Sequence, residues 1–236
     1  MTSRRSRSFG FTLIELLAVV AVIGILATIL VPTLSYARTA ASKARTRTQF
    51  SQWAAAFEAF RQEYGAYPQL YPTGSQHLVN QSASTTATAE HLFYDTLSGR
   101  RRDPTGSWNA ATTRNPPMPQ AQNTRRIQFV SFNDADMVIQ ADIPTYNTAL
   151  ELNFIRDGFH NTSIAVITDA NLDGVINLND CSGGYPSVTV SGATTTLKPL
   201  TTDLPAATTG GIHQGVIFYS APPGASTGSD LIMSWK

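Results

Sequence analysis

The residues best suited to chemistry are the oxygen-bearing side chains of one short segment, DANLDGVINLND. Asp or Asn occupies its first, third, fifth, ninth and twelfth positions, and its sixth is Gly174. A hard divalent cation takes about six to eight oxygen ligands, which alternate residues of a tight loop can supply while glycine permits the sharp turn. The segment, residues 169–180, therefore predicts a calcium site. The expected ligands are the side chains of Asp169, Asn171, Asp173, Asn177 and Asp180 and the carbonyl of Val175.

This loop resembles the calcium loops of EF-hands and, through Asn177 and its closing aspartate, those of dockerins. Two features depart from an EF-hand: the last ligand is the shorter Asp180, and a β-like segment stands where a helix would precede the loop. We therefore expect calcium to act as a structural clip and not as a sensor that opens. The alternative is a turn in which Asn, Asp and Gly satisfy their own backbone.

A second chemically unusual segment lies at the amino terminus. Residues 1–10, MTSRRSRSFG, are basic and polar, and an apolar run follows from residue 11 to residue 31 with Glu15 as its single charge. At ~1.5 Å per residue this run reaches about one hydrocarbon thickness, which predicts a membrane-spanning helix. The leader arginines predict a cytoplasmic amino terminus, with the rest of the chain beyond the membrane.

The carboxylate of Glu15 needs a positive partner, because an ionised glutamate in lipid is costly unless it is paired. Cleavage between Gly10 and Phe11 would create such a group, a new α-amino terminus. A plain signal anchor, in which Glu15 snorkels to the surface, is the alternative.

A basic leader followed by GFTLIE and an unbroken apolar helix resembles the type III leader of type IV pilins and type II secretion pseudopilins. In that family a prepilin peptidase cuts after the glycine and methylates the new amino terminus. The resemblance implies cleavage after Gly10, methylation of Phe11, and a role for Glu15 in neutralising a neighbouring subunit's terminus during assembly.

Helical patterning continues over residues 32–64 as an amphipathic second half of the same helix. Aromatic residues recur there at spacings of three and four and predict a buried stripe, which Gly65 ends. Four basic residues precede the stripe, and we interpret them as a solvated face just outside the membrane. The stripe comprises Phe50, Trp53, Phe57, Phe60 and Tyr64, and the basic residues are Arg38, Lys43, Arg45 and Arg47.

Residues 65–125 form a polar, variable loop region with one predicted helical turn, EHLFYDTLSG. Residues 126–236 form the head, in which short β-like runs alternate with turns. One long helix followed by such strands predicts an α+β, pilin-like fold with the helix packed across an antiparallel sheet. The predicted strands are residues 126–132, 136–141, 163–168, 186–190, 215–220 and 230–235.

Three segments beyond the apolar run resemble pieces of major pseudopilins. YGAYP, which starts at Tyr64, resembles the segment that closes their long helix, and the closing DLIMSW resembles their carboxy-terminal ending. RDGFHN is similar to their Asp-Pro-Trp-Gly-Asn stretch, with Gly158, Phe159 and His160 at three of its positions.

Composition excludes several classes of protein. Hydrophobic residues make up 42% and charged residues 14%, which indicates a folded or membrane-attached chain. The formal net charge is +1, and three of the positive charges are leader arginines. The rest of the chain therefore has no excess of positive charge, and no nucleic-acid partner is expected. The single cysteine, Cys181, excludes an internal disulfide and is expected to be a small filler or a tolerated surface thiol. No catalytic constellation is recognisable, so we expect no enzyme.

The resemblance implies a structural subunit of a type II secretion pseudopilus, anchored once in the bacterial inner membrane with its head in the periplasm. Its expected partners are copies of itself, other pseudopilins, the prepilin peptidase, an inner-membrane assembly platform and membrane lipid. A surface pilus subunit for adhesion, motility or DNA uptake shares the same amino-terminal features. A membrane-anchored, calcium-dependent binding module is the third possibility.

Overall fold

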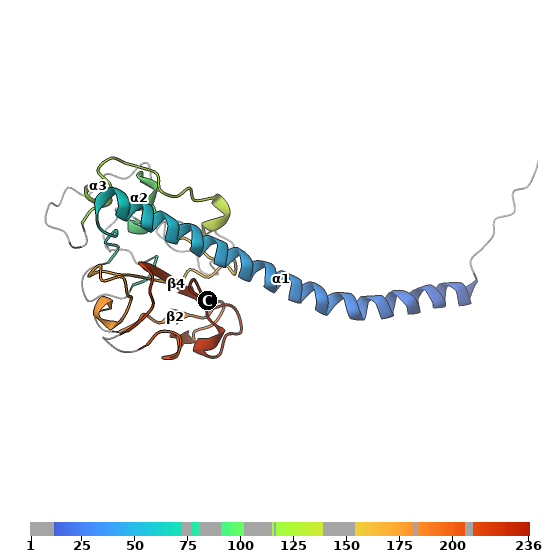
Figure 1. The fold of residues 1–236 in the computed structure, drawn as a ribbon. Coiled ribbons are helices and arrows are strands. Elements are labelled where there is room, and N and C mark those ends of the chain that lie inside the picture. The colour runs from blue at the N-terminus through green and yellow to red at the C-terminus, as the bar shows by residue number, and fades with distance from the viewer. Residues whose placement is uncertain are drawn as a thin grey trace, which may run out of the picture. The chain divides into compact units, whose positions relative to one another are not determined.

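The structure is a computed structural model that describes residues 12–71, 77–80, 91–101, 115, 117–138, 154–181, 184–205 and 210–236. The chain divides into two compact units, one up to Ser42 and one from Lys43 to Lys236. The first unit holds the apolar part of the long helix α1, and the second, which we call the head, holds the rest of α1 and the sheet (Figure 1).

Helix α1 runs from Leu13 to Tyr64, as the sequence predicts. It is rich in alanine and leucine, which lose little side-chain freedom in a helix. Gly65 ends it: this residue takes the left-handed conformation, with φ of 78°, and donates its N–H to the carbonyl of Arg61 at 2.7 Å. A glycine is favoured in this position because it has no Cβ to crowd the turn.

The head contains an antiparallel sheet of three strands in the order β1-β4-β5. Strand β1, Ile164–Thr168, pairs with β4, Val216–Ser220, so that Ile164 faces Ser220 and Thr168 faces Val216. Strand β5, Ile232–Met233, pairs with the other edge of β4. This antiparallel sheet after a long helix confirms the predicted α+β, pilin-like fold.

Both faces of the sheet are buried, because successive side chains of a strand point to opposite sides. Val166 and Phe218 belong to a core shared with α1, whereas Ile167 and Tyr219 belong to a second core on the other side. The predicted aromatic stripe of α1 fills the first core: Phe50, Trp53, Phe57 and Phe60 are each at most 3% exposed. The ring of Phe50 stacks on that of Phe218, with centroids 5.7 Å apart.

Shorter elements complete the head. Helix α2 confirms the helical turn predicted within EHLFYDTLSG, whereas α3 was not predicted. The helices are α2 (Leu92–Ser98), α3 (Pro119–Gln122) and three 3-10 turns, η1 (Asp134–Asp136), η4 (Leu178–Asp180) and η5 (Gly228–Asp230). A two-stranded ribbon pairs β2 (Val188–Thr189) with β3 (Thr196–Leu197).

One of the predicted strands is wrong, and a second, residues 136–141, is described only as far as residue 138. Residues 126–132 are not a strand, because Arg126 takes a positive φ of 54° and the N–H of Phe129 bonds the carbonyl of Leu97 at the end of α2. The described part of 136–141 begins in η1 and contributes only an isolated bridge, Met137 to Ile155. Strand β3 was missed, since its two residues carry no recognisable alternation.

Candidate functional site

The amino-terminal site is described from Thr12 onward, so Gly10 and Phe11 lie outside the described residues. The Glu15 carboxylate accepts hydrogen bonds from both the backbone N–H and the hydroxyl of Thr12, each at 2.8 Å. The Thr12 hydroxyl in turn accepts the N–H of Glu15 at 3.3 Å. This reciprocal arrangement is a capping box, which satisfies amide groups that the first turn leaves unpaired.

Thr12 therefore belongs to the amino-terminal site although the sequence reasoning did not include it. The signal was available, because threonine followed three residues later by glutamate before an apolar run is the sequence pattern of a capping box. Glu15 already accepts hydrogen bonds from a neutral residue of its own chain, so a positive group would have to share its carboxylate with Thr12.

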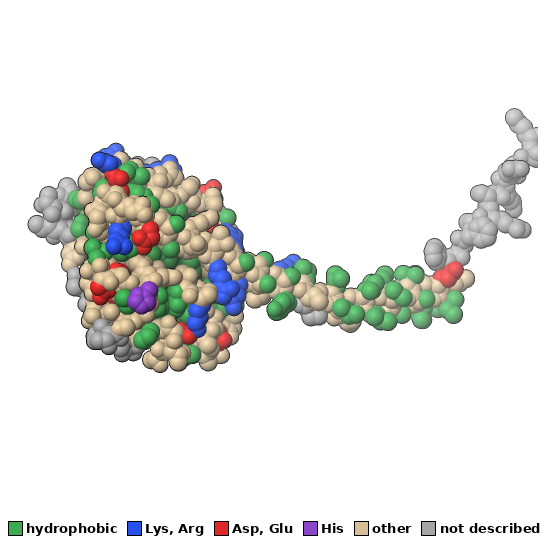
Figure 2. Space-filling model, in the orientation of Figure 1, with side chains coloured by type: hydrophobic (Ala, Val, Ile, Leu, Met, Phe, Trp, Pro, Cys, Tyr) green, Lys and Arg blue, Asp and Glu red, His purple; other side chains and the backbone are tan. Residues whose placement is uncertain are grey.

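The apolar surface of α1 is the second feature of this site. Within the described residues, α1 is the one helix long and apolar enough to cross a membrane, and its most apolar stretch has a mean hydropathy of 2.8 with nothing covering it. Leu13 is 81% and Leu30 67% exposed. A soluble chain rarely leaves such a surface in water, so this helix is consistent with membrane anchoring. Figure 2 shows this band of hydrophobic side chains on the first unit.

The predicted calcium loop, residues 169–180, begins directly after β1 and ends in η4. Asp180 ties its two ends together, since one carboxylate oxygen accepts the N–H of Ala170 and the other that of Asn177, both at 2.9 Å. Asp169 accepts the N–H groups of Asp173 and Gly174 at 3.2 and 2.8 Å. The loop thus has fixed ends made by buried carboxylates.

The middle of the loop is different, because Asn171 and Asp173 are exposed. Their side chains contact each other, with Nδ2 of Asn171 2.9 Å from Oδ2 of Asp173. Among the described residues, no group of three His, Cys, Asp or Glu side chains is placed to hold a metal. The all-oxygen donor set suits calcium, but the structure brings together the ligands at the loop ends without gathering all six.

Burial raises the pKa of the Asp180 carboxyl, and the negative charges of Asp169 and Asp173 raise it further. Hydrogen bonds from the N–H groups of Asn177 and Ala170 act in the opposite direction. Asp169 and Asp173 therefore lie close enough to the Asp180 carboxylate to repel it, and a cation beside Asp180 would relieve that repulsion.

A cavity of about 270 Å³ opens beside the loop. Its described walls include Tyr67 and Tyr71 from the segment after α1, and Asp169 and Asp180 from the loop. His77 also lines it, 3% exposed and stacked on Tyr71 with ring centroids 3.6 Å apart. Burial lowers the pKa of His77 to about 4, so the ring is neutral at neutral pH.

Cys181 follows the loop and is 2% exposed. Its sulfur lies 3.9 Å from Nδ1 of His77, and burial raises the pKa of its thiol to about 12. A thiol with such a pKa is protonated at neutral pH and is therefore a poor nucleophile. Cys181 is accordingly a buried filler, one of the two roles expected of it.

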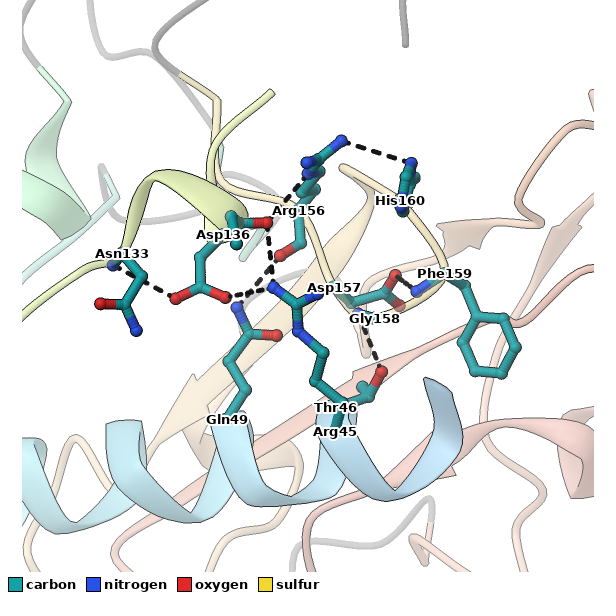
Figure 3. Close-up of polar contacts among 11 residues, drawn as sticks. Arg45, Thr46, Gln49, Asn133, Asp136, Arg156, Asp157, Gly158, Phe159 and His160 are labelled. Atoms are coloured by element: carbon teal, nitrogen blue, oxygen red, sulfur yellow. Dashed lines mark hydrogen bonds and ion pairs between the residues drawn. The ribbon is translucent and has the colours of Figure 1, made fainter. Parts of the chain in front are cut away.

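The RDGFHN segment docks on α1 through polar contacts (Figure 3). The hydroxyl of Thr46 accepts the N–H of Gly158 at 3.0 Å, and the side chain of Gln49 donates to the carbonyl of Arg156 at 3.0 Å. Asp157 and Asn161, which match the first and last positions of the pseudopilin stretch, close the segment: Asp157 accepts the N–H of Asn161 at 2.9 Å. This segment therefore fixes the first turns of the head's part of α1.

The sequence matches the prokaryotic N-terminal methylation motif over residues 5–31, which is consistent with a type IV prepilin-like leader. No curated protein and no solved structure gives a significant match.

The long apolar helix, the antiparallel sheet and this motif together define a pilin-like protein. The methylation motif supports membership of the type IV pilin and pseudopilin family, and it points to a structural subunit.

Proposed function

We propose that the chain is a structural subunit of a type II secretion pseudopilus. One observation carries the proposal: the methylation motif includes the apolar first part of α1, which has no cover within the described chain. Such a helix is stable in lipid before assembly and among identical helices afterwards. A fibre of these subunits would help to export proteins through an outer membrane.

In this proposal a prepilin peptidase removes residues 1–10 and methylates Phe11, and an inner-membrane platform adds the subunit to the fibre. Glu15 then pairs with the terminal amine of a neighbouring subunit. The Thr12 contacts leave its carboxylate with free lone pairs, since each carboxylate oxygen can accept more than one bond. The head lies in the periplasm and the amino terminus in the cytoplasm.

Three features of the head favour secretion over a surface pilus. YGAYP closes α1 as it does in major pseudopilins, with the Tyr67 hydroxyl donating to Glu58 at 2.6 Å. The carboxy-terminal strand β5 leads to Trp235, whose ring packs edge-on against Tyr219. The one cysteine, Cys181, excludes the disulfide-closed carboxy-terminal loop that would favour a surface pilin.

Mass spectrometry of the mature amino terminus tests processing. We expect a chain that begins with methylated Phe11, and an intact leader would support a membrane-anchored module instead. Secretion is then tested by deleting the gene and comparing exported proteins with surface fibres. Loss of export with normal surface fibres supports a pseudopilus, and the reverse result supports a surface pilus.

Assembly is tested with two variants that distinguish the helix-capping role of Glu15 from pairing with a neighbouring subunit. Glu15→Gln removes the charge, whereas Thr12→Val removes only the capping hydroxyl and keeps the carboxylate. If Glu15 pairs with a neighbour, Glu15→Gln abolishes fibres in a shear and electron-microscopy assay and Thr12→Val does not. Equal losses in both variants would mean that Glu15 acts only as a helix cap.

We further propose that calcium clips the loop 169–180 by drawing in Asn171 and Asp173 between the fixed ends. A ligand that binds only the folded state at about 100 times its dissociation constant adds about 2.7 kcal/mol of stability. For a chain of this size that corresponds to roughly 5–10 °C in melting temperature. We expect calcium to restore such a shift after chelation in the wild type and in the exposed control Asp134→Asn, but not in Asp169→Asn/Asp173→Asn. An unchanged wild-type melting temperature would exclude the clip.

A further inference from the structure

The charges on α1 are distributed unevenly along its length. No acidic residue occurs between Glu15 and Glu58, whereas four basic residues follow the apolar stretch. We call these four residues, Arg38, Lys43, Arg45 and Arg47, the basic collar. Figure 2 shows Lys and Arg side chains gathered at the end of the head where its part of α1 begins.

Within the described residues, one member of the basic collar is neutralised by an ion pair. Arg45 pairs with Asp136, with Nη2 3.0 Å from the carboxylate oxygen. Arg38, Lys43 and Arg47 are exposed and make no ion pair or side-chain hydrogen bond within the described residues. Asp134 lies in the same turn as Asp136, yet in the described structure it pairs with none of them.

The free charges do not share one side of the helix. At 3.6 residues per turn, the five residues from Arg38 to Lys43 rotate the side chain by about 140°. A protein partner that touches one side of α1 would meet only one of these two charges. A layer that surrounds the helix, such as the headgroups of a bilayer, would meet both.

Distance along the helix also favours a bilayer surface. Arg38 and Lys43 follow Val31, the end of the apolar stretch, by seven and twelve residues. At ~1.5 Å per residue these positions lie about 10 and 18 Å beyond the hydrocarbon, whose headgroup layer is roughly 5–8 Å thick. Arginine and lysine side chains can extend back toward such a layer. The distance that then remains between the Lys43 ammonium and the headgroups is within about 8 Å, one Debye length at physiological salt.

We infer that Arg38 and Lys43 bind the phosphate groups of anionic phospholipids on the head side of the membrane. This inference rests on the membrane anchoring in the proposed function and adds to it a lipid partner for the subunit before assembly. Each basic side chain near an anionic membrane surface raises the affinity of the protein for that surface roughly fivefold. Arg47, at about 24 Å, lies too far out to contribute fully.

The test uses the full chain reconstituted in bilayers with equal amounts of phosphatidylglycerol and phosphatidylcholine. Native mass spectrometry after gentle release counts each lipid retained per protein. We expect the wild type to retain severalfold more phosphatidylglycerol, and added salt to reduce the excess. Arg38→Gln/Lys43→Gln should remove most of the excess, Arg47→Gln little of it, and the matched control Arg100→Gln/Lys198→Gln none.

Several results would overturn the inference. These are equal retention of both lipids by the wild type, an undiminished excess in Arg38→Gln/Lys43→Gln, or an equal loss in the matched control. Cross-links from Lys43 to carboxylates of a second copy, with lipid retention unaffected by the double variant, would assign the charges to a protein partner. A chain that an alkaline wash removes from the bilayer would overturn the membrane anchoring itself, whereas an anchored chain without lipid preference would overturn only this inference.

Discussion

Arg45 and Arg156 donate to the same acceptor, the carbonyl oxygen of Ala135, from 3.0 and 3.1 Å (Figure 3). Arg45 belongs to α1 and Arg156 to the segment before β1, while Ala135 lies in the 3-10 turn η1. Two like charges converge there because a carbonyl has two lone pairs and Asp136 pairs with Arg45. One turn thus joins α1 to the RDGFHN segment.

The two arginines should differ in their effect on stability. Arg156 is 7% exposed, so Arg156→Gln should lower the free energy of unfolding by about 1–3 kcal/mol, the effect of losing a buried charged donor. The Arg45 side chain is 45% exposed, and Arg45→Gln should cost less than about 1 kcal/mol because solvent screens its ion pair. Urea unfolding of the full chain in detergent measures both values. Equal effects would contradict the ranking.

Trp53 should be among the most sensitive positions of the head. It is 2% exposed, and its ring contacts those of Phe50, Phe93, Phe132 and Phe218. Trp53→Ala would leave a cavity and should cost about 3–5 kcal/mol in urea unfolding. The exposed neighbour Gln52→Ala serves as control and should stay within about 0.5 kcal/mol of the wild type. A small effect at Trp53 would mean that the stripe does not pack on the sheet.

Asp157 should make stability fall as pH rises. Burial raises the pKa of its carboxyl above the ordinary value of 3.8, against the opposing hydrogen bonds from Asn161, Ser220 and Phe159. The folded state therefore binds a proton more tightly than the unfolded state, and this contribution is lost as pH rises from 3.8 through the folded pKa. Asp157→Asn should abolish that decline in a pH series of unfolding measurements.

Replacing Asp157 by alanine provides the contrast. The amide of Asn can still accept the two N–H groups and donate to the Ser220 hydroxyl. At neutral pH, Asp157→Asn should therefore leave the free energy of unfolding nearly unchanged. Asp157→Ala would leave those N–H groups buried without partners, at about 1–3 kcal/mol each. Similar stability of the two variants at neutral pH would argue against this hydrogen-bond network.

Two glycines with the same backbone conformation should respond differently to alanine. Gly65 and Gly99 have φ of 78° and 68°. A Cβ on Gly65 would meet nothing within 4 Å, so Gly65→Ala should cost only the strain of the left-handed conformation, about 1–2 kcal/mol. A Cβ on Gly99 would lie 2.5 Å from the carbonyl oxygen of Arg126. Gly99→Ala should therefore cost clearly more in the same unfolding assay, and equal costs would contradict that close approach.

The amino-terminal region up to Gly65 could be predicted because its signals are local. The length and apolarity of the run to residue 31, the spacing of the aromatic stripe and the helix stop at Gly65 each depend on neighbouring residues alone, and the structure agrees with all three. The methylation motif is local in the same sense. Even the missed capping box of Thr12 and Glu15 was readable from its spacing.

The strand predicted at residues 126–132 shows where prediction from local sequence fails. Their apolar residues alternate like those of a strand, but Arg126 turns the chain, and the carbonyl of Leu97 and the side chain of Asn123 take the hydrogen bonds that a sheet would offer. Strand identity depends on a partner that lies far away in sequence, so a pattern within one segment cannot supply it. The same limit applies to β3, which exists only because β2 lies beside it.

The sequence by itself determined the apolar helix, its leader and the supply of oxygen ligands in residues 169–180, because composition and spacing suffice for each. Only the tertiary structure decided that Asp169 and Asp180 have fixed positions while Asp173 is exposed. It also decided that Arg45 is paired, whereas Arg38 and Lys43 have no ion pair among the residues that the structure describes. These outcomes depend on which distant groups the fold places within hydrogen-bonding distance, and no spacing along the chain encodes that directly.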